Sequence, residues 1–215
     1  MANVTYTTHH GFGVTYDDAF LTHCDDPADA RSQAAWHTHL PAAAAASVLF
    51  APRGATAAEI AGGLVPSQLI TTDGEPRTPR ALAGWDWDDE ARRLGALFLE
   101  RTGMGSLEAT AVYWRGFPVL QLSAVPVPDE EAPPTQRPAA PIEVLGVLLT
   151  PAQAFTSLLV MPLTAVEEWG ERFQQLMDGF YLDPIEREGR VRTGHQLVRS
   201  LHVDARDVRE DLTAR

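Results

Sequence analysis

Histidine and cysteine are the residues of this sequence with the most obvious chemistry, and most of them fall within the first 39 positions. They are His9, His10, His23, Cys24, His37 and His39. Imidazole and thiolate groups are good ligands for zinc or copper, and a thiolate beside an imidazolium is an activated nucleophile. Two enzymes follow as hypotheses: a metal-dependent hydrolase that uses the histidines, and a cysteine hydrolase centred on Cys24.

The spacing of these residues argues against both enzymes. No spacing among them matches an established metal signature, and His37 and His39 fall on a predicted helix, where residues two apart do not face each other. Neighbours on a strand point to opposite faces, so His23 does not pair directly with Cys24. The sequence has no Gly-x-Ser-x-Gly elbow and no glycine-rich phosphate loop. We therefore expect a protein without enzymatic activity or cofactor, with the metal-dependent hydrolase as the alternative.

Two other segments have residues typical of partner contacts. Trp85 and Trp87 stand at a predicted helix start, where large aromatic side chains serve as core contacts or as anchors for a partner. Between residues 184 and 215, apolar residues recur every three or four positions, which predicts an amphipathic tail helix. They are Leu197, Leu201, Ala205, Val208 and Leu212. We expect this tail to dock on its own domain, on a second copy of the chain or on another protein, with self-association preferred.

Composition and charge narrow the class of protein. The 215 residues suffice for one domain, and the formal net charge is −12, with 17 arginines and no lysine. The acidic excess lies entirely before residue 183, and such a body repels phosphate groups, which disfavours nucleic acids and anionic membranes as partners. The beginning of the sequence has no basic region or apolar signal core, and the lone cysteine agrees with a reducing compartment. We expect a cytoplasmic protein.

The hydrophobic pattern predicts the elements that position these residues. Strands are expected at both ends of the segment 4–20 and at 46–51, 68–72, 107–113, 119–125, 143–150 and 155–162. Helices are expected at 26–39, after Thr56, after Asp86 or Asp88, and from Thr164 to Gly179. Thr56 and Thr164 each open a capping box, with a glutamate three residues later. The last helix has an apolar stripe that should lie on a sheet, and the Pro-rich, acidic segment 126–141 is predicted to be a mobile loop.

This order of strands, a long helix, two hairpins and a closing helix resembles the PsbP-like superfamily, which includes the Mog-type Ran-binding proteins. The stretch from Gly11 to Phe20 is similar to the opening of that superfamily, with Phe20 in place of its tryptophan. Val48 to Pro52 resembles the following strand, and Thr164 to Leu182 resembles the closing helix.

The resemblance implies an α+β fold in which helices pack on the faces of an antiparallel sheet, as an α/β/α sandwich. It places residues 1–183 in one domain, followed by the charged tail 184–215. It also implies a non-catalytic binding or accessory module acting through protein–protein contacts, and no catalytic residue carries over. The residues predicted to bind a partner are Trp85, Trp87, Leu197, Leu201, Val208 and Leu212.

Overall fold

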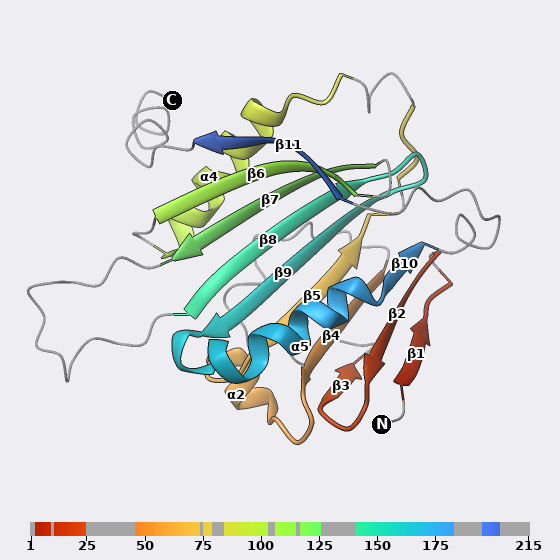
Figure 1. The fold of residues 1–215 in the computed structure, drawn as a ribbon, viewed down its shortest axis with the longest axis vertical. Helices are drawn as coiled ribbons and strands as arrows, with labels where there is room; N and C mark the ends of the chain where they lie inside the picture. The colour runs from red at the N-terminus through yellow and green to blue at the C-terminus, as the bar shows by residue number, and fades with distance from the viewer. Residues whose placement is uncertain are drawn as a thin grey trace, which may run out of the picture.

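The computed structural model describes residues 3–9, 11–24, 46–73, 75–78, 84–102, 106–114, 117–125, 141–182 and 195–202 (Figure 1). Its strands are β1 (Asn3–Thr7), β2 (Phe12–Asp17), β3 (Leu21–Cys24), β4 (Ala46–Pro52), β5 (Ser67–Thr72), β6 (Ser106–Trp114), β7 (Phe117–Val125), β8 (Pro141–Leu149), β9 (Ala154–Pro162), β10 (Phe180–Leu182) and β11 (His195–His202). Its helices are α2 (Ala57–Ala61), α4 (Trp87–Thr102), the short 3₁₀ turn η2 (Leu163–Ala165) and α5 (Val166–Asp178).

The strands form two antiparallel sheets. Eight strands pair in the order β11-β6-β7-β8-β9-β5-β4-β3, and β1-β2-β10 form a second, three-stranded sheet. The predicted hairpins β6–β7 and β8–β9 are therefore confirmed, and so are the two strands predicted between residues 4 and 20 and the strands β4 and β5. The described fold is thus α+β, built from antiparallel sheets and a few helices.

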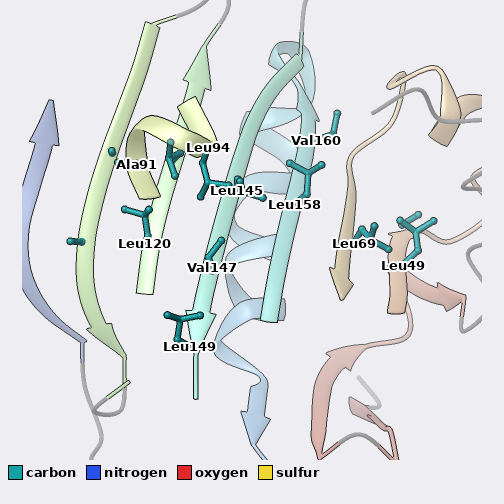
Figure 2. Packing of buried hydrophobic residues seen from close by; sticks show 14 of the residues in the cluster. Leu49, Leu69, Ala91, Leu94, Leu120, Leu145, Val147, Leu149, Leu158 and Val160 are labelled. Carbon is teal, nitrogen blue, oxygen red and sulfur yellow. The ribbon is translucent and has the colours of Figure 1, made fainter. Parts of the chain in front are cut away.

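Two hydrophobic cores lie on opposite faces of the eight-stranded sheet. Side chains of the first core, including Leu120, Leu145 and Leu158, face α4 (Figure 2). The second core includes Phe12 from the small sheet, Phe50 from β4 and Phe173 from α5. Figure 1 accordingly shows α4 behind the large sheet and α5 across its front. None of the described helices is long and apolar enough to span a membrane.

The helix starts follow the capping rules in two cases of three. The Thr56 hydroxyl accepts from the Glu59 N–H at 3.3 Å and the Glu59 carboxylate accepts from the Thr56 N–H at 2.8 Å, so this capping box is confirmed. Asp86 caps α4, because its carboxylate accepts hydrogen bonds from the N–H groups of Asp88 and Asp89. The capping box predicted at Thr164 is wrong: Thr164 lies inside η2, and α5 begins at Val166 without a side-chain cap.

Gly179 ends α5, as predicted, for a reason that the sequence pattern does not reveal. Its carbonyl accepts a hydrogen bond from the Thr15 N–H at 2.9 Å, so the chain passes directly against β2 at this point. A Cβ at residue 179 would overlap the carbonyl oxygen of Thr15. The close approach of β2 and the start of β10 therefore requires glycine.

The prediction of a helix in the C-terminal tail is wrong for the part of the tail that the structure describes. Residues His195–His202 form a strand that pairs with β6, with Leu197 opposite Val112 and Leu201 opposite Ala109. An isolated helix of this length is marginal in water, whereas the free edge of β6 offers a row of unpaired backbone groups. The rest of the predicted stripe, including Val208 and Leu212, lies outside the described residues, and so do the predicted helix 26–39 and the loop residues 126–140.

Candidate functional site

Strand β8 has apolar residues on both of its faces, and its one charged residue, Glu143, is buried on the α4 side. Leu145, Val147 and Leu149 point toward α4 and are buried there. Ile142 and Val144 alternate with them and point to the opposite face. A strand that is apolar on both sides is typical of a sheet that is covered on both sides.

The two sides of this sheet are covered unequally. Ile142, Val144 and their cross-strand neighbour Leu159 are only partly buried, although each is a large aliphatic residue. In Figure 1, α5 lies over the β9, β5 and β4 side of the front face, and no described helix crosses in front of β6 and β7. A groove with a volume of about 390 Å³ runs between α5 and this part of the sheet.

One face of α5 forms the wall of the groove, and strands β6 to β9 form its floor. Val166, Gly170, Phe173 and Met177 contribute to the wall, at the spacing of one helix face. At 1.5 Å per residue, this wall is roughly 18 Å long. The apolar residues of the floor are Val112, Val119, Ile142, Val144, Leu148, Phe155, Leu159 and Met161, and Ile70 of β5 lines the groove beside them. Trp114 and Phe180 line the groove as well, with ring centroids 5.6 Å apart.

Two glycines leave room in this groove. Gly146 lies in the floor and Gly170 in the wall, and neither has a positive φ that would demand glycine. A Cβ at Gly146 would meet the Ser157 Cβ at 4.0 Å, and a Cβ at Gly170 would meet the Val166 Cγ1 at 3.9 Å, which are ordinary contacts. Glycine inside a strand or helix costs about 0.5–1 kcal/mol relative to alanine. Inside a strand it often marks the close approach of a ligand or another backbone.

A short polar track crosses the apolar floor. Gln121, Gly146 and Ser157 are cross-strand neighbours on β7, β8 and β9. Beside them, the buried Gln68 amide donates to the Ser157 hydroxyl at 2.7 Å and to the Met177 sulfur at 2.7 Å. Its carbonyl oxygen has no hydrogen-bond partner among the described residues. An apolar cleft with a few convergent polar groups is the usual composition of a binding site.

The edge of the groove on α5 is acidic. Asp178 lines the groove, and Glu167 and Glu171 are eleven and seven residues before it, on the same side of the helix. The single arginine of α5, Arg172, points away and lies over the Phe20 ring at 3.9 Å and the Trp169 ring at 4.7 Å. None of the described residues that line the groove is basic.

The two tryptophans predicted to bind a partner lie elsewhere. Trp85 and Trp87 have ring centroids 4.7 Å apart and pack, partly buried, against the core under α4, on the opposite face of the sheet from the groove. Trp87 also meets Tyr113 edge-on at 6.0 Å. Leu197 and Leu201 lie on the edge strand β11. In that strand, Leu197 is opposite Val112, which lines the groove, and Leu201 is opposite Ala109 of the first core.

The described histidine and cysteine residues do not form a catalytic arrangement. His23 turns inward, where its Nδ1 lies 2.7 Å from the Tyr16 hydroxyl and its ring 4.8 Å from the ring of Tyr6. Cys24 is exposed on the edge strand β3, so the expectation that these neighbours face opposite ways is met. Within the described ranges, no three His, Cys, Asp or Glu side chains could hold a metal ion together. His10, His37 and His39 lie outside those ranges.

The groove residues were missed in the sequence analysis. Gly146, Gly170 and Gln68 have no motif around them, because their role depends on which strands α5 covers. A signal was nevertheless present in β8, whose apolar residues occupy both alternating positions. That pattern predicts a cover on each face, and on the groove face several of these residues stay partly exposed.

Comparison with known proteins supports the fold. No protein-family model and no curated protein sequence matches this chain. Among solved structures, the cyanobacterial PsbP (CyanoP) of Synechocystis sp. PCC 6803 matches with a TM-score of 0.51 and 13% identity, over 84% of this chain and 92% of that chain. A point mutant of Mog1 matches with a TM-score of 0.40 and 13% identity, over 85% of this chain and 96% of that chain. The fold is PsbP-like, as the sequence resemblance indicated.

Proposed function

We propose that this chain is a non-catalytic accessory or binding module that acts through protein contacts, with a segment of another protein held in the groove beside α5. One observation carries the proposal: a sheet that is apolar on both faces is left partly open on the α5 side. Exposed apolar surface of this kind typically marks an interaction site. The described residues that line the groove include no histidine, cysteine or paired carboxylates with which to carry out a reaction.

The form of the groove favours a protein segment over a small molecule. Pockets for small ligands bury most of the ligand surface, whereas floor residues of this groove such as Ile142, Val144 and Leu159 remain partly exposed. A chain segment fits such a site, because it needs cover on one face only.

We also propose a second contact, through the C-terminal segment, with another protein or with a second copy of the chain. β11 is an edge strand of the eight-stranded sheet, and an edge presents unpaired backbone groups that can pair with another strand. Trp85 and Trp87 remain candidate anchors for a partner on the opposite face. Neither contact is needed for the groove to bind.

Site-specific photocrosslinking in the native cell tests the groove. A benzophenone side chain in place of Val144 should crosslink to another protein, and the same side chain in place of Thr5, on the exposed side of the small sheet, should not. Adding Gly146→Leu fills the floor next to residue 144 and should remove the crosslink. Equal crosslinks from both positions, or a crosslink that survives Gly146→Leu, would contradict the proposal.

A further inference from the structure

We infer that the segment held in the groove is an amphipathic helix with basic residues along one flank, an inference that rests on the proposed function of the groove. Three features of the groove lead to it: its width, the space left by its glycines, and the charge along its edge.

The width of the open floor matches one helix. Neighbouring strands lie about 4.8 Å apart, so β6, β7 and β8 span roughly 10 Å. A helix with its side chains is about 10–12 Å across. α5 already covers the β9 side of the same face, and the wall it presents is about three helical turns long. A second helix, lying beside α5 on the same sheet face, would complete the cover that the apolar pattern of β8 predicts.

The glycines permit this close approach. Gly170 removes the side chain from the wall at the middle of α5, and Gly146 removes it from the centre of the floor. Helices pack with their axes 8–10 Å apart, and the shorter distances need small residues at the contact. The polar track of Gln121 and Ser157 crosses the floor beside Gly146, so one polar side chain of the partner can be accommodated there.

Charge selects the flank of the partner helix. Asp178 lines the groove, and helical spacing places Glu167 and Glu171 on the same side of α5. Arg172, in contrast, lies over the Phe20 ring. The whole chain has a formal net charge of −12. A partner helix that lies beside α5 therefore places one flank against a row of carboxylates, and lysine or arginine on that flank is attracted to them while glutamate is repelled.

Two synthetic peptides test the inference. Both are 14-residue helices with leucines on one face and alanines elsewhere, and they differ in three flank residues, which are lysine in one and glutamate in the other. Fluorescence anisotropy at low salt should show that the lysine peptide binds the parent protein about tenfold more tightly, as expected for three exposed charge pairs. The preference should shrink in high salt, because salt screens exposed charges.

Protein variants locate the effect. Glu167→Gln with Glu171→Gln and Asp178→Asn should abolish the preference for lysine. A control that removes the same charge elsewhere, Asp88→Asn with Asp89→Asn and Glu168→Gln, should retain it.

A peptide variant tests whether the partner must be helical. Proline at the centre of the lysine peptide breaks a helix and should weaken binding at least tenfold.

The possible failures are distinguishable. If both peptides bind the parent equally, or if the proline peptide binds undiminished, the inference is wrong. The groove then still stands as a site, provided that Gly146→Leu weakens binding. If neither peptide binds the parent, or if Gly146→Leu leaves binding unchanged, the groove is not the binding site and the proposed function fails with it.

Discussion

The two faces of the eight-stranded sheet are built from the same strands but are completed differently. On the face that α4 packs on, Leu120, Leu145 and Leu158 are buried in the first core. On the other, α5 and the small sheet cover β9, β5 and β4, while Val144 and Leu159 stay partly exposed along a groove. The closed face shows what a completed core looks like in this protein. On the open face, the part of the sheet left uncovered is about as wide as one helix. We propose that a partner covers this part.

Under the proposed function, the comparison also separates residues that stabilise the fold from residues that serve binding. A residue on the closed face contributes its full burial to the folded state. A residue on the groove contributes part of its burial now and the rest when a partner is bound. The same substitution should therefore have unequal effects on the two faces.

The largest expected difference concerns two adjacent leucines on β9. Leu158 is 3% exposed in the first core, on the sheet face that α4 packs on, and Leu159 lines the groove. Leu158→Ala should lower the free energy of unfolding by about 2–5 kcal/mol, because it leaves a cavity in a closed core. Leu159→Ala should cost less than half as much. Urea denaturation of the two variants measures both values, and equal losses would mean that the two faces are equally closed.

The next effect concerns Asp73, whose carboxylate joins the end of β5 to the start of β9. Asp73 follows β5, and its carboxylate accepts from the N–H of Ala154 at 2.9 Å and from that of Glu75 at 3.0 Å, and pairs with Arg77. Burial raises the pKa of Asp73, but the hydrogen bonds from Arg77, Ala154 and Glu75 outweigh it and leave this pKa below its usual value. Asp73→Asn should cost about 1.5–3 kcal/mol at neutral pH, as expected for hydrogen bonds to a charged group.

The direction of the pH dependence follows from the lowered pKa of Asp73. The stabilisation is complete above the unfolded-state value of about 3.9 and is lost as the pH falls through the lower folded-state value. Urea denaturation between pH 2 and 5 should show a smaller loss of stability in Asp73→Asn than in the parent. The same loss in both proteins would show that the Asp73 contacts contribute nothing.

The smallest effect concerns the glycines. Gly170→Ala in α5 and Gly146→Ala in β8 should each raise the free energy of unfolding by about 0.5–1 kcal/mol, because the added Cβ meets no close neighbour. Gly179→Ala is the control and should destabilise, because its Cβ overlaps the Thr15 carbonyl. Thermal unfolding measures all three. A loss of stability at Gly146 and Gly170 would mean that the groove is already filled by the chain itself.

Local signals in the sequence predicted most of the fold. The Thr56 capping box and the β8–β9 hairpin join residues that are close along the chain, so their patterns can be read without knowing the tertiary structure. β11 was missed because it pairs with β6, more than 80 residues earlier, and its four-residue spacing of leucines also fits a helix. Capping at Thr164 failed because the chain makes a 3₁₀ turn first.

The candidate site was less predictable than the fold. Its features are two ordinary glycines, Gly146 and Gly170, and aliphatic residues that look like any core. Their importance depends on the position of α5 over the sheet, which is determined by long-range contacts such as Phe173 with the second core. The one local clue, apolar residues on both faces of β8, predicts a cover without saying whether the chain or a partner supplies it.

Thiol labelling at the groove floor tests the central claim most directly. Cys24 is the lone cysteine, so Cys24→Ser provides a background without thiols, into which Val144→Cys and, as a control, Thr5→Cys are introduced. The rate of reaction with a maleimide is measured in the purified protein and in the native cell. We predict that residue 144 reacts readily when purified and is at least tenfold protected in the cell, whereas residue 5 reacts alike in both. Equal labelling of residue 144 in both settings would contradict the claim that a partner occupies the groove.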